Sequence, residues 1–344
     1  MDTPSLEQNL AKLRHHKGAE HSLRGFEPHY TDIVDYIVRI THRIWEEGDI
    51  GYIYDTYRSN VTMHTGYGTA YGVEEVMSGT VAFAAALPDR RLYAEDVVWT
   101  GDDERGFHTS HLLINAATNT GYSPWGPPTG RRVNFFAIAN CLVKENRIVE
   151  EWLVRDTGAI VRQLGFDLWK VARDAASVWP ANVSGETDRL FGQLPPAPYE
   201  PQEGHIETFV GRLFHEVWNA RHFNYLTEWY AGDSSLFVPN HLELRGVANI
   251  RAYHLNFIAM FPDAHMNVEH VYYLGDEETG YRVAVRWRFS GTHARYGWYG
   301  EPTDRRVNIL GVSHLHIEND KVTKHYMVFD NLAVVMQLVG GGKG

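Results

Sequence analysis

The sequence predicts two α+β units in tandem, and two observations carry this prediction. First, residues 72–165 align without a gap with residues 246–339, which indicates an internal duplication. The segments that match most closely are 126–134 with 300–308 and 83–89 with 257–263. Second, within each repeat the helical patterns come first and the strand patterns follow, which is typical of an α+β unit with an antiparallel sheet rather than of a parallel α/β sheet.

The repeat divides the chain into four parts. We expect an N-terminal extension over residues 1–29, a first unit over 30–168, a linker over 169–203 and a second unit over 204–340. Prolines crowd residues 193–201, as in an extended linker. Residues 168–190 are compatible with a short helix that packs on the first unit.

Hydrophobic spacing predicts the elements of each unit. A helix is expected over residues 30–47, because one helical face collects apolar side chains: Ile33, Tyr36, Ile37, Ile40 and Ile44. A second helix is expected over 72–86 and ends before Pro88. Strands are expected over 96–100, 106–116, 132–144 and 148–155. In the second repeat, residues 281–289 alternate apolar with other side chains, which indicates a strand with one apolar face.

Composition narrows the class of protein. The net charge of −11 and the lack of a Lys/Arg block argue against a nucleic-acid partner. The apolar run 81–87 is too short to span a bilayer, and no secretory pattern opens the chain, so we expect no membrane partner and a cytoplasmic location. The single cysteine, Cys141, excludes an intrachain disulfide and is expected to be a small buried residue in a strand.

Motifs near the end of each repeat resemble those of the SnoaL-like polyketide cyclases of the NTF2-like superfamily. The first repeat has a Gly-x-Pro-Thr-Gly-Arg turn over 126–131, Glu-x-Trp-x-x-x-Asp over 150–156 and Gln-Leu-Gly over 163–165. The second repeat has Thr303–Arg306, Asp330 and Gln337-Leu338 in matching places. The resemblance implies a curved antiparallel sheet wrapped around helices, an α+β cone or barrel with one deep pocket. It implies a small hydrophobic or aromatic ligand, and neither a metal nor an organic cofactor.

The same resemblance implies an oligomer and a catalytic pair. Units of this type pair through their sheets, so we expect a homo-oligomer or an intrachain pseudo-dimer. In the resembled cyclases an acid–base Asp on the last strand works with a His fourteen residues earlier on the preceding strand. Asp330 and His316 match this pair in the second repeat, whereas the first repeat keeps Asp156 but has Leu142 in place of the His.

The two aspartates have two interpretations. Residues of equal parity share a face of a strand, so Asp156 lies on the face of Trp152 and Val154. Apolar surroundings would raise the pKa of such a carboxyl group and suit it to proton transfer. Alternatively, each aspartate caps the helix that follows it, because Asp is a favoured N-cap residue.

Histidines and aromatic residues complete the predicted site. His314 and His316 share a strand face. They could act in acid–base chemistry, hold a hydrogen bond or pack in the core. They could also bind a metal, but this needs a third ligand, which the sequence does not mark. In the first repeat, His64 and His111 are the candidates, with His108 facing away from His111. The expected substrate-binding residues are Tyr54, Tyr57, Trp125, Asn140, Trp152, Arg288 and Tyr326.

Together these features predict a cofactor-independent acid–base enzyme of the lyase, cyclase or dehydratase type. Its substrate would be a small aromatic or polyketide-like molecule, with lignin-derived aryl compounds as one such class. The alternative is a small-molecule-binding or scaffold protein without turnover. Asn140 and Leu142 in place of His314 and His316 favour the second unit as the active one, whereas His64 and His111 favour the first.

Overall fold

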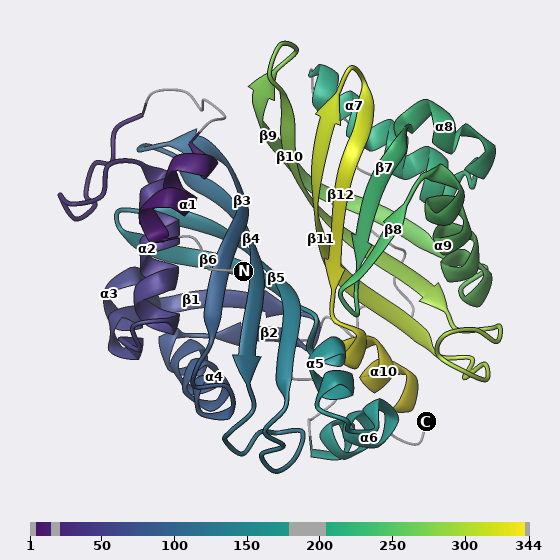
Figure 1. Ribbon diagram of the computed structural model, residues 1–344, viewed down its shortest axis with the longest axis horizontal. Coiled ribbons are helices and arrows are strands. Elements are labelled where there is room, and N and C mark those ends of the chain that lie inside the picture. Colours follow the sequence, from purple (N-terminus) through teal and green to yellow (C-terminus); the bar gives the residue numbers. More distant parts are fainter. Residues whose placement is uncertain (1–4, 15–20, 179–203, 341–344) are drawn as a thin grey trace.

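The computed structural model describes residues 5–14, 21–178 and 204–340, in which two units share one order of elements (Figure 1). The proline-rich stretch 193–201 lies outside the described residues.

The first unit begins with helices. α1 (Leu6–Leu13) is tied to the edge of the sheet by the Asn9 side chain, which bonds the backbone oxygen and nitrogen of Ala94 at 2.7 and 3.0 Å. α2 (Ile33–Trp45) starts at Asp32, which accepts a hydrogen bond from the Asp35 nitrogen at 2.7 Å, as an N-cap does. The predicted apolar stripe of α2 is buried. Short turns η1 (Ile50–Tyr52) and α3 (Ile53–Thr56) follow, and the helix expected over 72–86 is α4 (Val73–Ala86).

Six strands form the first sheet: β1 (Tyr57–Thr65), β2 (Gly68–Tyr71), β3 (Arg91–Asp102), β4 (Gly106–Thr118), β5 (Arg132–Lys144) and β6 (Arg147–Arg155). Their order is β2-β1-β6-β5-β4-β3. The α+β class is confirmed, but the sheet is mixed and open, because β1 runs parallel to β6 while the other neighbours are antiparallel. The expectation of a wholly antiparallel barrel is therefore wrong in this detail. α4 connects β2 at one edge of the sheet to β3 at the other edge. The strands β3 to β6 then follow one another back across the sheet, so that β6 lies beside β1.

Two helices close the first unit, α5 (Thr157–Gln163) and α6 (Leu168–Val178). A short helix was expected here, packed on the first unit. Instead, α6 packs mainly on α10 (Asn331–Val339) of the second unit, and Leu168, Val171 and Ala172 join the apolar core of that unit.

The second unit repeats the plan. Its helical elements are α7 (His205–Phe214), η3 (His215–Asn219), η4 (Phe223–Tyr225), α8 (Leu226–Trp229), α9 (Val247–Met260) and α10. Its strands are β7 (Tyr230–Val238), β8 (Leu242–Arg245), β9 (His265–Asp276), β10 (Gly280–Thr292), β11 (Arg306–Glu318) and β12 (Lys321–Phe329), in the order β8-β7-β12-β11-β10-β9. The alternation predicted over 281–289 is confirmed, since Val283, Val285, Trp287 and Phe289 are buried on one face of β10.

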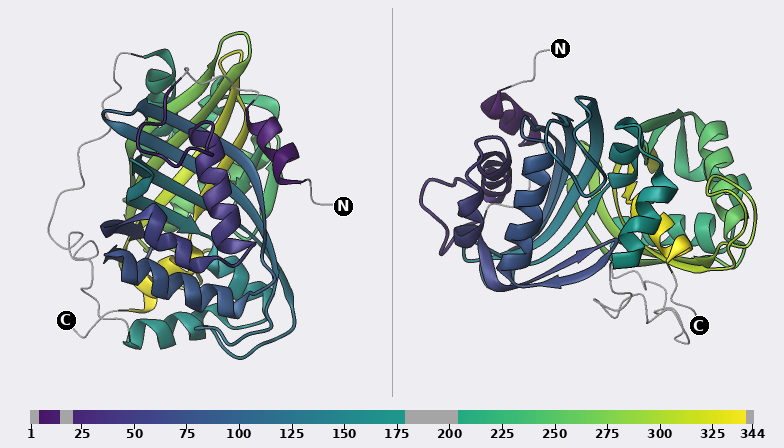
Figure 2. Two further views of the ribbon diagram at one scale, coloured as in Figure 1. Left: turned by 90° about the vertical axis from the view of Figure 1, so that its left-hand side faces the viewer. Right: turned by 90° about the horizontal axis from the view of Figure 1, so that it is seen from below.

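The two sheets pack against each other, and most helices of each unit cover the opposite side of its sheet (Figure 2). We call the side that meets the other sheet the interface face and the side under the helices the helix face. An apolar cluster joins the interface faces: Leu112, Phe136, Ile138, Trp152 and Val154 with Leu310, Val312, Tyr326 and Val328. Both faces of both sheets are therefore largely buried, and the two units pair through their sheets within one chain. No helix in the described part of the chain is long and apolar enough to cross a membrane.

Candidate active site

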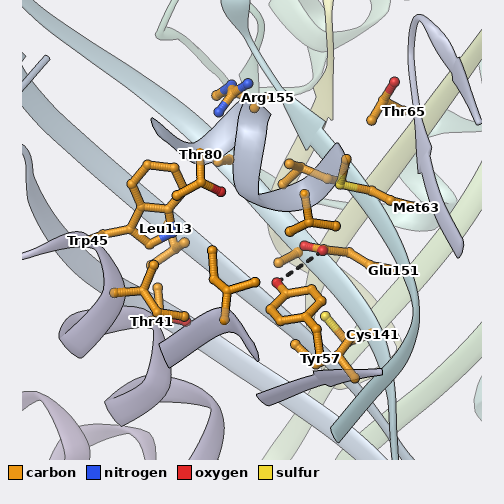
Figure 3. Close-up of a pocket in the computed structure, with 18 of the residues that line it drawn as sticks. Thr41, Trp45, Tyr57, Met63, Thr65, Thr80, Leu113, Cys141, Glu151 and Arg155 are labelled. Carbon is orange, nitrogen blue, oxygen red and sulfur yellow. Dashed lines mark hydrogen bonds between the residues drawn. The ribbon is translucent and has the colours of Figure 1, made fainter. Parts of the chain in front are cut away.

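A cavity of about 160 Å³ lies in the first unit between the helix face of its sheet and helices α2 and α4. Apolar side chains form much of the wall, among them Ile37, Ile40, Ile44, Leu113 and Ile148. Polar and ionisable side chains interrupt this wall at several places, among them Arg155, Glu151 and Tyr57 (Figure 3). An apolar pocket with a few convergent polar groups is the usual form of a small-molecule site.

The carboxyl group of Glu151 is the central ionisable group of the cavity. Glu151 lies on β6 with only 5% of its surface exposed, and the Tyr57 hydroxyl donates to its Oε2 at 3.1 Å (Figure 3). Burial raises the pKa of Glu151 to about 7, although the Tyr57 hydrogen bond and the charge of Arg155 oppose the shift. A carboxyl group with such a pKa can both accept and release a proton near neutral pH.

Two arginines also line the cavity. Arg155 lies on the same strand face as Glu151, at the end of β6, with its guanidinium carbon 3.8 Å from the ring centre of Phe83. Arg90 is 5% exposed and donates to Asn115 Oδ1 at 2.9 and 2.7 Å. Burial lowers the pKa of both guanidinium groups.

The second unit contributes to this cavity. Asp330, which follows β12, lines the cavity of the first unit, and the Tyr67 hydroxyl donates to its Oδ2 at 2.6 Å. The backbone nitrogens of Gly158 and Leu332 donate to Oδ1 at 3.3 and 2.9 Å. Burial raises the pKa of Asp330, against the opposing effect of its hydrogen bonds. The site is therefore built from both repeats.

In the second unit, larger side chains stand at several positions that line the first cavity. Tyr253 stands at the position of Gly79, Trp287 at that of Leu113, and Phe329 at that of Arg155. Trp287 and Phe329 are almost fully buried, with ring centres 6.1 Å apart. At the position of Glu151 the second unit has His325, which bonds Tyr230 and Ser313 at 2.9 Å each. Tyr253 and Phe329 also line a more open hollow of about 500 Å³, which extends to Trp298 and to Arg162 of the first unit.

The two predicted aspartates are N-caps, which was the alternative interpretation. Asp156 accepts from the Ala159 nitrogen at 3.1 Å, and Asp330 caps α10 through Leu332. Asp156 shares a face with Trp152 and Val154 as expected, but that face meets the other sheet rather than a pocket. Its Oδ2 accepts from the backbone nitrogen of Asn240, and burial raises its pKa to about 7.

The resemblance implied that His316 and Asp330 act as a pair in one cavity. In the structure, Asp330 lines the cavity of the first unit and His316 does not. His314 and His316 share a face of β11, as predicted, and this is the interface face, where both contact Asp96 of the first sheet. Asp96 Oδ2 lies 3.1 Å from His314 Nδ1 and 3.4 Å from His316 Nε2, and His314 Nε2 lies 2.8 Å from Ser110 Oγ. Within the described residues, no group of three His, Cys, Asp or Glu side chains is placed to hold a metal ion.

The two candidate histidines of the first repeat, His64 and His111, lie on opposite faces of the first sheet. His111 lies on the helix face, 1% exposed, with Nδ1 3.4 Å from Thr41 Oγ1, and burial lowers its pKa to about 3. It is close to the cavity wall through Thr41 but does not line the cavity. His64 lies on the other face, where it stacks on Trp152 and its Nε2 lies 2.9 Å from Glu150 Oε1.

Of the predicted substrate-binding residues, only Tyr57 lines the cavity. Tyr54 is 47% exposed, and Trp125 packs edge-on to Phe83 at 6.0 Å. The other four lie at the interface between the sheets: Asn140 bonds Tyr272, Trp152 lies under Arg286, Arg288 pairs with Glu269, and Tyr326 donates to Glu95. Cys141 is buried in β5, as predicted, and lines the cavity.

Sequence reasoning missed Glu151, Arg155, Arg90 and Tyr67. A signal for three of them was present in the repeat itself. Glu151 is replaced by His325, Arg155 by Phe329 and Arg90 by Ala264 at matching positions, so the ionisable set is specific to the first unit.

The chain contains two α+β units of the same plan, and the first of them encloses a cavity of about 160 Å³. The family model for the SnoaL-like polyketide cyclases matches residues 35–164 and again residues 208–338, so the chain belongs to this family. Among curated proteins, none matches this chain.

Solved structures of similar proteins each align with little more than one unit. A proposed SnoaL-like polyketide cyclase from Jannaschia sp. CCS1 is 21% identical over 42% of this chain and 99% of its own, with a TM-score of 0.37. IdmH, a proposed polyketide cyclase from Streptomyces antibioticus, is 21% identical over 39% of this chain and 99% of its own, with a TM-score of 0.34. A Catenulispora acidiphila protein with a ketosteroid isomerase-like fold is 15% identical over 38% of this chain and 90% of its own, with a TM-score of 0.32.

Proposed function

We propose that the first unit is the catalytic one and that its cavity transfers a proton to or from carbon in a small ligand. The observation that carries this proposal is the contrast between the two interiors. The first holds Glu151, with a pKa near neutrality, and two arginines, whereas the second has His325, Phe329 and Ala264 at these positions and Trp287 in place of Leu113.

Glu151 is the proton acceptor in this proposal. Tyr57 donates to Oε2, and no described residue donates to Oε1, which leaves that oxygen available to the ligand. The ionised carboxylate takes a proton from a carbon next to a carbonyl group, and the electron pair of the broken C–H bond moves onto the carbonyl oxygen as an enolate. Return of the proton to another atom of the ligand completes an isomerisation, and attack of the enolate on a second carbonyl group completes a cyclisation.

Tyr67 and Asp330 form a second proton-bearing pair. If Asp330 is protonated, its proton can bond the Tyr67 oxygen, and the Tyr67 proton then becomes available to the oxygen that gains charge. Such a donor in a site with little water stabilises an enolate more than it would in solution. The second unit thus takes part in the chemistry through Asp330.

The wall of the cavity suits a ligand that carries a ring. Trp45, Tyr57 and Tyr67 line it, and a dry cavity of about 150 Å³ in another protein holds benzene. We propose a small aromatic or polyketide-like substrate, with lignin-derived aryl compounds as one class. Elimination of water begins with the same transfer of a proton from carbon, whereas retro-aldol cleavage of a carbon–carbon bond would begin with removal of a hydroxyl proton by the same base and would release the enolate.

Filling the cavity tests the proposal. A Cβ atom at Gly79 would meet no other atom within 4 Å, and the second unit has Tyr253 at this position. We expect Gly79→Tyr to reduce exchange of the acetyl hydrogens of acetophenone with deuterated water by about 100-fold or more, because the new ring occupies the ligand space. Proton NMR measures this exchange.

Gly79→Ala is the matched control, since it adds one methyl group to the same helix and leaves the cavity open. Both variants should unfold at the wild-type temperature or higher, because glycine weakens a helix. Unchanged exchange in Gly79→Tyr would place the chemistry outside this cavity and leave a binding protein as the better description.

A further inference from the structure

Two arginine side chains that line the first cavity each have a buried N–H group without a hydrogen-bond acceptor among the described residues. Arg155 Nε and Arg90 Nη1 are buried and have no hydrogen-bond partner in the described part of the chain. Neither arginine forms a salt bridge there, and the partner of Arg90 is the neutral side-chain oxygen of Asn115. Buried donors without partners are uncommon in folded proteins and cost free energy.

The charge of the two arginines is not balanced within the cavity. Glu151 and Asp330 are the carboxyl groups that line it, and burial raises the pKa of both, which favours their neutral forms. Guanidinium groups keep their charge in proteins even where burial lowers their pKa, so two carboxyl groups that are only partly ionised at neutral pH do not fully offset the two arginines. A buried charge without a partner is costly unless an anion joins it.

The arginines are specific to the hollow unit. Ala264, Phe329 and Phe289 stand in the second unit at the positions of Arg90, Arg155 and Asn115. The second unit therefore lacks both guanidinium groups and the amide that holds one of them. Their presence coincides with the cavity.

We propose that the cavity of the first unit binds a ligand with a carboxylate group, which pairs with Arg155 and, through Nη1, with Arg90. The planar guanidinium group matches a carboxylate with two parallel hydrogen bonds. This inference rests on the proposed function for the place of the substrate, and it adds the chemical class: a small aryl carboxylate. The carboxylate is an anchor and does not itself react.

A matched pair of probes tests the inference. 4-Fluorobenzoate and 4-fluorobenzamide have nearly the same size and differ in charge. We expect the wild-type protein to bind the benzoate at least about tenfold more tightly, measured by fluorine NMR titration at neutral pH. Equal affinities, or no binding of the benzoate at millimolar concentration, would overturn the proposal.

Arginine variants locate the selectivity. Arg155→Met should abolish the preference for the benzoate, and Arg155→Lys should keep part of it. Arg162→Met is the matched control, because Arg162 is exposed and lines the hollow of the second unit. If Arg162→Met removes the preference and Arg155→Met does not, the carboxylate binds elsewhere.

Stability gives a second readout that needs no ligand. Arg155 Nε has no hydrogen-bond partner in the described residues, and methionine keeps an apolar side chain beside Phe83, so the ligand-free Arg155→Met variant should melt close to the wild-type temperature. A large fall in melting temperature would assign Arg155 a structural role and contradict the inference. Glu151→Gln should retain benzoate binding, so failure of the anchor and failure of the proposed proton transfer are distinguishable.

Discussion

Glu151→Gln is expected to reduce acetophenone exchange by about 10²- to 10⁴-fold, the usual contribution of a general base. Glutamine keeps the size of the side chain and can still bond Tyr57, but it cannot accept the proton. In the wild-type protein the exchange rate should rise with pH and level off above about 7, because the carboxyl group must be ionised to act as a base.

Glu150→Gln is the matched control for this prediction. Glu150 is the preceding residue on β6 and points to the other face, where it pairs with His64. Its substitution should leave exchange and the pH profile unchanged. Equal losses in both variants would indicate damage to the strand rather than the loss of a base.

Glu151→Gln should also affect stability with a defined sign. The folded-state pKa lies above the unfolded value, so the contribution of Glu151 to stability is full below the unfolded pKa of about 4.5 and is lost as the pH rises from there to about 7. Glutamine does not titrate. The free energy of unfolding of the variant, relative to wild type, should therefore increase between about pH 4.5 and pH 7 and stay constant above pH 7.

Asp96→Ala is expected to lower the free energy of unfolding by about 3 kcal/mol at neutral pH. Asp96 is 6% exposed and joins the sheets through His314, which is fully buried. Burial opposes the charge of Asp96, but the hydrogen bonds of His314 and His316 lower its pKa overall. Its contribution is present above the unfolded pKa of about 4 and is lost as the pH falls below it.

Urea unfolding at neutral and acidic pH measures this effect, and the difference from wild type should shrink in acid. Asp174→Ala is the control, because its pair with Lys170 is exposed and should contribute less than about 1 kcal/mol. A loss of the same size in both variants would contradict a stabilising role for the buried contact between the sheets.

The duplication, the α+β class and the main helices and strands could be predicted from the sequence. The repeat and the hydrophobic periods are properties of the chain itself, as the buried stripe of α2 shows. The parallel pairing of β1 with β6 could not be predicted, since it depends on where α4 places the rest of the sheet.

The site was harder to predict because strand parity does not say which face lies under the helices. Both faces of these sheets are buried, so the apolar neighbours of Asp156 and His314 gave no sign of the interface. Glu151 and Arg155 have the opposite parity to Asp156. A comparison of the repeats residue by residue would have found them, since His325 and Phe329 replace them.

The most direct test of the central claim is a crystal structure of the protein with 4-fluorobenzoate bound. We predict one ligand in the cavity of the first unit, with its carboxylate on Arg155 and its ring near Tyr57. A ligand seated only in the hollow beside Trp298, with the first cavity empty, would contradict the assignment of the first unit as the active one.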